Sequence, residues 1–344
     1  VSGGADSVAM LEILTRRKSA GELHSDLIIA HIDHQLRGRH SDKDRQFVSE
    51  LAEKHGLPFI CSLVDVTNYA ERNRLSVETA ARDLRLDTLA GIAAQQNCSA
   101  VATAHHKNDN AETLIQRIRR GTGYRGLAGI WPTRPLNPEI CLIRPLLCLK
   151  REQIIKYLKA RNLTWRTDHT NLDTRYRRNF IRHRLIPELQ KNCKTDLTES
   201  LFELANTARG FFKKISEKTH EIWPDVARSE DFCQVLDADI FASLTRPVQV
   251  ELIRRALDRL GCGQRNLRQY HFNAVCRLAV EKTVAGSVDL PEGFTAKRTY
   301  EHLVFFHPQK SSQTTAPESL GKVRLEPPGA AEFAGYKIET ESLP

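Results

Sequence analysis

Apolar residues in the first part of the chain alternate between short unbroken runs and stretches with helical spacing. The short runs are typical of buried strands, and the helical spacing is typical of amphipathic helices. We expect strands at 26–34, 58–64, 100–104 and 139–143, and helices directly after residues 2–7 and at 42–55, 76–96 and 110–120. Strands and helices that alternate in this way predict the α/β class, with an open parallel sheet and helices on both faces.

Beyond residue 150 the pattern becomes mainly helical. We expect polar helices over 150–190, a connecting helix over 195–220, and helices over 237–282 followed by a hairpin of 287–291 and 299–306. A run rich in Ser, Thr and Pro after Gln309 predicts a linker. The predicted divisions are therefore 1–190, a helical connector at 191–236, a smaller, mostly helical domain at 237–308, and a linker with the start of an incomplete C-terminal domain at 309–344.

A tight glycine turn lies between the first apolar residue and the first helix. Its residues are Val1, Ser2, Gly3, Gly4, Ala5, Asp6 and Ser7. Glycine lets backbone N–H groups come close to a ligand, and the start of a helix favours negative charge. The lysine of a Walker A loop is missing, whereas Asp6 puts a carboxylate beside the anion, as expected if Mg²⁺ bridges the two. The alternative is an ordinary strand–helix turn.

Polar side chains gather just past three predicted strand ends. The groups are Asp6, then His31, Asp33 and His34, then His105, His106 and Asp109. Ligands bind at the carboxyl ends of parallel strands, so we expect one shared crevice. Asp109 and Glu112 are three residues apart on one helix face and, with Asp6, could hold a divalent ion that carries a triphosphate. A lone His or Asp at such a place is more often a helix cap.

Composition sets the broad class. The chain has 344 residues, of which 40% are hydrophobic and 27% charged, as expected for a globular protein of two or three domains. No apolar stretch approaches the roughly 18 residues of a membrane span. The 8 cysteines are scattered without a C-x-x-C pair, which argues against a zinc or iron–sulfur site and suits reduced thiols in a cytoplasmic protein. The chain begins without Met, so we expect part of the first strand to be missing.

Positive charge points to a polyanionic partner. The formal net charge is +9. The densest basic segment contains Arg175, Arg177, Arg178, Arg182 and Arg184, with Tyr176 and Phe180 among them. The interleaved aromatic residues and the absence of carboxylates between Asp173 and Glu188 favour contact with RNA. The alternative is a solvated helix face, which is the usual role of a run of charges.

Taken together, the motifs resemble the tRNA(Ile)-lysidine synthetase family within the PP-loop ATP pyrophosphatases. The motifs are Ser2–Ser7, His31–Arg37, Glu78–Arg85, Ala104–Thr113, Arg120–Leu127, Arg144–Leu147, Trp165–Asp173, Tyr176–Arg182 and Ile186–Pro187. The order and spacing hold over 1–190 and more loosely to about residue 307. The sequence departs from the family at Asn108 and Asn110, where Asp and Gln are usual, and at Gln35, where Gly is usual.

The resemblance implies a reaction and its participants. ATP would activate the C2 carbonyl oxygen of the wobble cytidine in a CAU-anticodon tRNA(Ile), with release of pyrophosphate, and free L-lysine would then displace AMP to give lysidine. It implies ATP and Mg²⁺ as cofactors, a tRNA-binding helical domain, and an oligomeric state that stays open, with a homodimer among the options. A tRNA contact through Arg175, Arg177, Arg178, Arg182 and Arg184 fits this family.

The resemblance also implies roles for single residues. Ser2, Gly3, Gly4, Ala5, Asp6, Ser7, His31 and Glu112 would contact the nucleotide, Asp6 and Asp109 would hold the metal, and Asp6, Arg82, His105 and Asp109 would serve catalysis. Arg82 would stabilise charge on the α-phosphate, although a surface salt bridge is equally consistent with its position. His105 would orient phosphates or accept a proton from the attacking amine.

Three other interpretations stay open. A PP-loop tRNA thiolase would generally rely on paired cysteines, which are missing here. An amidotransferase of the GMP- or asparagine-synthetase kind would need a glutaminase domain, for which no stretch is available. A non-catalytic tRNA-binding module is suggested by Asn108 and Asn110 alone. The residues that argue against it are Asp6, Arg82, Asp109 and Glu112.

Overall fold

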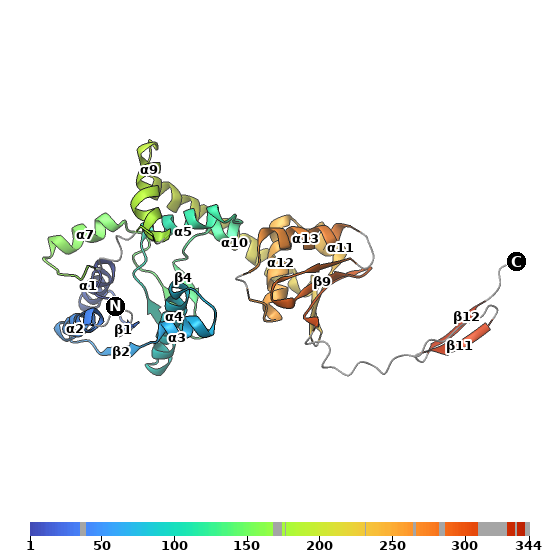
Figure 1. Ribbon diagram of the computed structural model, residues 1–344, viewed down its shortest axis with the longest axis horizontal. Coiled ribbons are helices and arrows are strands. Elements are labelled where there is room, and N and C mark those ends of the chain that lie inside the picture. The colour runs from blue at the N-terminus through green and yellow to red at the C-terminus, as the bar shows by residue number, and fades with distance from the viewer. Residues whose placement is uncertain are drawn as a thin grey trace. The chain divides into compact units, whose positions relative to one another are not determined.

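The chain divides into two compact units, Val1–Phe212 and Lys213–Pro344 (Figure 1). The computed structural model describes residues 1–34, 39–167, 174–175, 177–230, 232–263, 266–281, 286–308, 329–333 and 336–340. Gln35–Arg37, Asp168–Asp173, Tyr176 and the linker expected after Gln309 lie outside the described residues. The division falls within helix α10 (Leu197–Val226), and the boundaries expected at residues 190, 236 and 308 stay predictions.

The first unit is built on parallel strand pairs, which confirms the predicted α/β class. Strand β1 (Ile29–Asp33) pairs in parallel with β2 (Phe59–Leu63), and β3 (Ala100–Ala102) pairs in parallel with β5 (Cys141–Ile143). The other edge of β5 carries an antiparallel strand, β4 (Thr133–Pro135). The pattern did not predict β4, because its three exposed residues have no apolar alternation. Pro135 suits this edge position, since proline donates no ladder hydrogen bond.

Helices follow the strands of the first unit in the predicted order. They are α1 (Ala5–Ser19), α2 (Arg39–Lys54), α3 (Val66–Arg72), α4 (Val77–Gln95), α5 (Lys107–Arg119), α6 (Tyr124–Leu127), α7 (Arg151–Ala160), α8 (Arg177–Phe180), the π-helical turn Ile181–Leu185 and α9 (Ile186–Lys191). The short helix α3 was not predicted; it begins at Asp65, whose carboxylate accepts from the N–H of Asn68. Two turns are too short to show a helical period.

Buried side chains fix the helix that carries the opening loop. Ala5, Val8 and Ala9 of α1 pack with Leu146 and with Ile154 and Leu158 of α7. On another side, Leu11 packs with Ile29 of β1 and with Val48 and Ala52 of α2. Since small and apolar residues of α1 are held from two directions, the N-terminal end of the helix has a defined position. In the described residues no helix has the length and apolar character that crossing a membrane requires.

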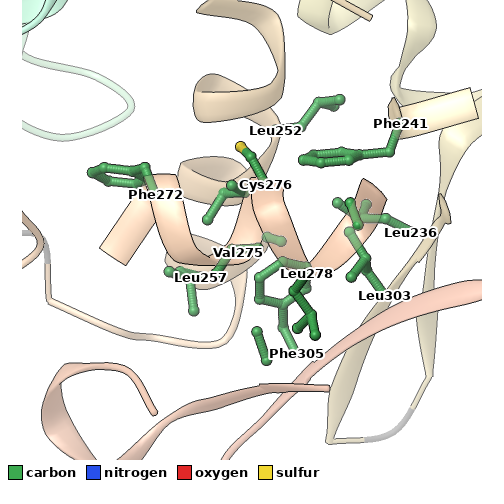
Figure 2. Packing of buried hydrophobic residues seen from close by; sticks show 14 of the residues in the cluster. Leu236, Phe241, Leu252, Leu257, Phe272, Val275, Cys276, Leu278, Leu303 and Phe305 are labelled. Carbon is green, nitrogen blue, oxygen red and sulfur yellow. The ribbon is translucent and has the colours of Figure 1, made fainter. Parts of the chain in front are cut away.

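The second unit combines helices with an antiparallel sheet. Its strands β6 (Ala227–Glu230), β7 (Cys233–Asp237), β8 (Ser287–Asp289), β9 (Thr295–Arg298) and β10 (His302–Phe306) are arranged in the order β6-β7-β10-β9-β8. The helices are α11 (Ala238–Ser243), α12 (Arg246–Arg259) and α13 (Gln269–Val280). Figure 2 shows the core between these layers, with Phe241, Phe272 and Phe305 among its buried residues. Further along the chain, β11 (Gly329–Phe333) and β12 (Tyr336–Thr340) pair with each other.

The prediction of a hairpin from 287–291 and 299–306 is wrong. Strand β9 lies between the two segments and pairs with both β8 and β10. The pattern hid β9 because one of its two buried positions is Arg298, whose guanidinium donates to the carbonyl of Ala279. Strands β6 and β7 likewise occupy part of the stretch expected as a helical connector.

Candidate active site

The opening loop is held by its own backbone and serine side chains. Gly3 has φ of +80°, and a Cβ at this position would come within 3.2 Å of the Phe47 ring. Ser7 Oγ accepts from the N–H of Ser2 at 3.2 Å and donates to the carbonyl of Gly4 at 2.9 Å. Gly4 is the N-cap residue of α1, and among the described residues no side chain caps the start of this helix. The first N–H groups of α1 are therefore available to an anion.

Asp6 lies in the first turn of α1, and one of its two carboxylate oxygens has no hydrogen-bond donor among the described residues. Its Oδ2 accepts from Arg151 at 2.6 Å and lies 3.7 Å from His106 Nε2, whereas its Oδ1 is buried and has no hydrogen-bond partner in the described part of the chain. Burial acts to raise the pKa of Asp6, but the polar contact with His106 and its charge, together with the charge of Arg151, outweigh it, so the pKa lies below its usual value. A buried, ionised oxygen without a donor fits a bound cation.

Asp109 is tied to the start of α5 by a reciprocal cap. His106 begins the helix and its Nδ1 accepts from the N–H of Asp109 at 3.3 Å, while Asp109 Oδ2 accepts from the N–H of His106 at 3.0 Å. The remaining oxygen, Oδ1, accepts from Arg178 at 2.8 Å and from Arg182 at 3.1 Å. Burial acts to raise the pKa of Asp109, and the charges of His106 and Arg178 outweigh it, so the pKa is lowered.

Glu112 completes a closed group of charges with the same two arginines. It lies one helical turn after Asp109, its side chain is 1% exposed, and its oxygens accept from Arg178 Nε at 2.8 Å and Arg182 Nε at 2.5 Å. We call Asp109, Glu112, Arg178 and Arg182 the carboxylate–arginine cluster. Two carboxylates and two guanidiniums balance each other in it, so its charges are compensated within the fold.

This cluster bears on two predicted assignments. Arg178 and Arg182 were expected to bind tRNA, yet both donate to buried carboxylates, whereas Arg177 and Arg184 are exposed. Asp109 was expected to hold a metal with Asp6, yet both of its oxygens already accept hydrogen bonds. Within the described residues no group of three or more His, Cys, Asp or Glu is placed to bind a metal ion. The site thus fits Mg²⁺ at Asp6, and fits it at Asp109 only after Arg178 and Arg182 have moved.

A separate cavity of about 580 Å³ lies in the same unit and is strongly basic. We call it the arginine pocket, after the arginines that line it: Arg82, Arg85, Arg117, Arg134, Arg144 and Arg178. Of the described residues that line it, Glu78 is the one carboxylate. The Nε atoms of Arg85 and Arg144 are buried and find no hydrogen-bond partner in the part of the chain that the structure describes. Burial, then the charges of Arg134 and Arg82, lower the pKa of Arg144 to about 10. The pocket therefore holds positive charge that its own walls do not neutralise.

The predicted catalytic residues Arg82 and His105 both line this pocket. His105 Nδ1 lies 3.1 Å from Thr103 Oγ1. Burial, with the nearby positive charges of Arg144 and Arg85, lowers the pKa of His105 to about 3 against the attraction of Asp109, so its ring is neutral at pH 7. His31, expected at the nucleotide, is buried, and its Nδ1 lies 2.8 Å from the carbonyl of Val1.

The two departures from the family pattern have structural roles. Asn108 Oδ1 accepts from the N–H of Arg151 at 2.9 Å and so links the starts of α5 and α7. Asn110 is fully buried, and its Oδ1 accepts from the N–H of Ile130 at 2.7 Å. Gly129 has φ of +61°, and a Cβ there would lie 2.2 Å from Asn110 Oδ1. Both amides therefore position backbone, which a hydrogen-bonding side chain without charge can do.

Three arginines from different elements hold the loop that walls the pocket. Arg117 of α5 donates to the carbonyls of Gly126 and Gly129, both at 2.9 Å. Arg209 of α10 donates to those of Ala128 at 3.0 Å and Ile130 at 2.7 Å, and Arg144 donates to that of Trp131 at 2.6 Å. The sequence assigned no role to Arg85, Arg117, Arg134, Arg144, Arg151 and Arg209. Arg85 and Arg144 did have a signal, because they belong to the motifs Glu78–Arg85 and Arg144–Leu147.

Comparison with known proteins first defines the class. The PP-loop domain family matches residues 1–189. Two curated relatives named tRNA(Ile)-lysidine synthase are 34% identical over 308 residues (Geobacter sulfurreducens) and 32% identical over 346 residues (Caldanaerobacter subterraneus subsp. tengcongensis). The matches cover 89% and 100% of this chain, and 64% and 72% of those proteins. The chain belongs to the tRNA(Ile)-lysidine synthase family of PP-loop proteins and spans about two thirds of the length of these relatives.

A solved structure is also similar in part. The U34-tRNA thiolase NcsA of Methanococcus maripaludis, with its [4Fe-4S] cluster, matches with a TM-score of 0.49 and 18% identity. The match covers 60% of this chain and 69% of the thiolase.

Proposed function

We propose that this protein ligates L-lysine to C2 of the wobble cytidine of a CAU-anticodon tRNA(Ile), with ATP as co-substrate and AMP and pyrophosphate as products. The relatives' names support the reaction. The single observation that carries it is the pair of neighbouring histidines: His106 lies 3.7 Å from Asp6 of the opening loop, while His105 lines the arginine pocket. An activating nucleotide and a second anionic substrate thus have adjacent sites.

The opening loop supports binding of the leaving pyrophosphate. The backbone N–H groups of Ser2–Ser7 and of the first turn of α1 would hold the β- and γ-phosphates. Asp6, through its unpartnered Oδ1, would hold Mg²⁺, which when bound would neutralise the charge of the triphosphate. His31 stays a proposed nucleotide contact.

Two residues of the arginine pocket support the transfer of the adenylyl group from ATP to the cytidine. Arg82 would stabilise the negative charge that develops on the α-phosphate. His105, neutral at pH 7, would orient that phosphate by a hydrogen bond. We assign this orienting role to His105 rather than proton transfer, because a pKa of about 3 makes the unliganded ring a weak base.

The remaining partners are proposed from charge and composition. The exposed Arg175, Arg177 and Arg184 would contact the tRNA backbone. Asp109 and Glu112, once Arg178 and Arg182 move, would be available to the metal or to the ammonium groups of lysine. None of the 8 cysteines forms a disulfide, which suits a reducing cytoplasm.

The direct test supplies ATP, radiolabelled lysine and CAU-anticodon tRNA(Ile), and follows AMP, pyrophosphate and the mass of the cytidine. We expect stoichiometric AMP and pyrophosphate and a lysine-sized mass gain at that base. Asp6→Asn should lower the rate of AMP formation by about 100-fold or more, because it removes the charge beside the phosphates. Asp87→Asn, an exposed carboxylate on α4, is the matched control and should behave as wild type.

Two results would contradict the proposal. AMP release with a different RNA or amine, but none with this tRNA and lysine, would leave the PP-loop class and reject lysidine formation. Binding of tRNA with no AMP release for any substrate would instead support the non-catalytic alternative.

A further inference from the structure

The arginine pocket is separate from the opening loop. Residues 1–7 do not contribute to its lining. The lining comes from six segments: the residue after β1, α4, the stretch from His105 into α5, the loop before β4 with β4 itself, the residue after β5, and the basic segment. His105 and His106 mark the division, since His105 lines the pocket and His106 contacts Asp6. With the β- and γ-phosphates on the loop and the α-phosphate near Arg82 and His105, the part of the pocket around Arg85 and Arg134 is available to another ligand.

The pocket offers cations without partners. Among the described residues, the guanidiniums of Arg82, Arg85 and Arg134 make no hydrogen bond or ion pair, in contrast to those of Arg117, Arg144 and Arg178. Unpaired buried charge is costly, and Arg85 Nε is buried without any partner. Arginine is the side chain best suited to phosphate oxygens, because its planar fork binds two of them at once. A phosphate group is the ligand chemistry that these three residues fit.

The lining also includes an aromatic and apolar surface. Trp131 and Ile130 line the pocket, and the Trp131 ring is held edge-on by Phe212 at a centroid distance of 5.9 Å. A volume of about 580 Å³ lies in the range of small-molecule sites, which is roughly 300–1,000 Å³. Proteins recognise unpaired RNA by stacking bases on aromatic rings while cations hold the backbone.

We propose that the arginine pocket binds one unpaired nucleotide of the RNA substrate, with its base against Trp131 and a flanking phosphodiester on Arg85 and Arg134. The proposal rests on the proposed function, which supplies RNA as the substrate. Arg85 and Arg134 then set the position of the target strand relative to the nucleotide site. The other source of the same phosphate chemistry is ATP itself, and the experiment separates the two.

The experiment measures binding of the CAU-anticodon tRNA against KCl concentration for Arg85→Gln, Arg134→Gln and Arg134→Lys. For each lost phosphate contact the slope of log K against log salt should fall by about 0.7, the value for single strands. We expect each Gln variant to bind tRNA roughly 5- to 10-fold more weakly and ATP as tightly as wild type. Arg134→Lys should retain the slope because it keeps the charge. Arg119→Gln, an exposed position on α5 outside the pocket, is the matched control and should leave both ligands unaffected.

Trp131→Phe gives a second readout, because stacked bases quench tryptophan fluorescence. The quenching caused by tRNA should fall in this variant and persist in Trp165→Phe, which lies outside the pocket. Gln variants that lose ATP affinity but bind tRNA with the wild-type slope would overturn the proposal in favour of ATP. If both Gln variants keep the wild-type salt slope and the protein forms lysidine, the pocket proposal is overturned and the proposed function stands. Changed slopes in a protein that forms no lysidine would support it and reject the proposed reaction.

Discussion

Two groups of arginines in the first unit differ in whether their charge is compensated. In the carboxylate–arginine cluster, Arg178 and Arg182 bind Asp109 and Glu112 through contacts of 2.5–3.1 Å. In the arginine pocket, Arg82, Arg85 and Arg134 face one carboxylate, Glu78, and make no ion pair within the described chain. Arg178 belongs to both groups. The difference teaches that residue type alone does not separate arginines that hold the fold from arginines that await a ligand.

Removing a carboxylate should destabilise the fold in the carboxylate–arginine cluster but not in the arginine pocket. The loss of stability in the cluster is the largest effect we expect. Glu112→Gln leaves two guanidiniums partly buried beside a neutral group, and should lower the free energy of unfolding by about 3 kcal/mol. Glu78→Gln removes an exposed side chain and should change it by less than about 0.5 kcal/mol. Because Glu78 opposes the positive charge of the pocket, its loss should tighten tRNA binding. Urea unfolding and tRNA titration measure the two effects.

Equal losses of stability in the two variants would show that the contrast between the groups is wrong. Arg182→Gln serves as the reciprocal change, and in combination with Glu112→Gln it should lose less stability than the sum of the two single losses.

The next largest effect is a pH dependence set by His105. Its pKa is about 3 in the folded protein and about 6.5 when unfolded, so between these values the unfolded state binds more protons. Stability is therefore lost as pH falls from 6.5 toward 3, by up to roughly 3 kcal/mol at pH 4.5. In His105→Gln this part of the loss should vanish, as unfolding at pH 7 and pH 4.5 would measure. Asp6 and Asp109 do not obscure this range, because their lowered pKa values affect stability only below about pH 4.

A bound polyanion should also change the pKa of His105. A phosphate near Arg85 and Arg134 reduces the positive potential at His105, so its pKa should rise on tRNA binding, as an NMR titration of the ring would report. A pKa that stays near 3 in the complex would mean that no anion enters the pocket.

Much of the fold could be predicted because the strands and helices that position the loop have regular apolar periods. The parallel strands, α1, α2, α4 and α5 are of this kind. Elements without such a period were missed: β4 has three exposed residues, and β9 buries Arg298 where an apolar residue is expected. A pattern cannot show that a buried arginine has found a carbonyl partner.

The candidate site was predictable where its residues are adjacent in sequence. The residues from His105 to Glu112 follow the end of β3, and the turn at Ser2–Ser7 leads into the first helix, where His106 lies 3.7 Å from Asp6. The arginine pocket comes from six separate segments, and the chain order does not reveal that Arg85 and Arg134 meet. Nor does a basic segment reveal which of its arginines turn inward, since Arg177 and Arg178 are identical in type and adjacent.

The smallest expected effect separates the two sides of that segment. Arg177→Gln and Arg184→Gln change exposed residues, so the free energy of unfolding should shift by less than about 0.5 kcal/mol for each. If they contact the tRNA backbone, each should weaken binding by a few-fold and reduce the salt slope by less than about 1. Arg178→Gln, one residue away, should also cost stability, because Asp109 and Glu112 lose a partner. Wild-type slopes in Arg177→Gln and Arg184→Gln would make the outward side an ordinary solvated face, and any RNA contact would then have to come from the pocket side alone.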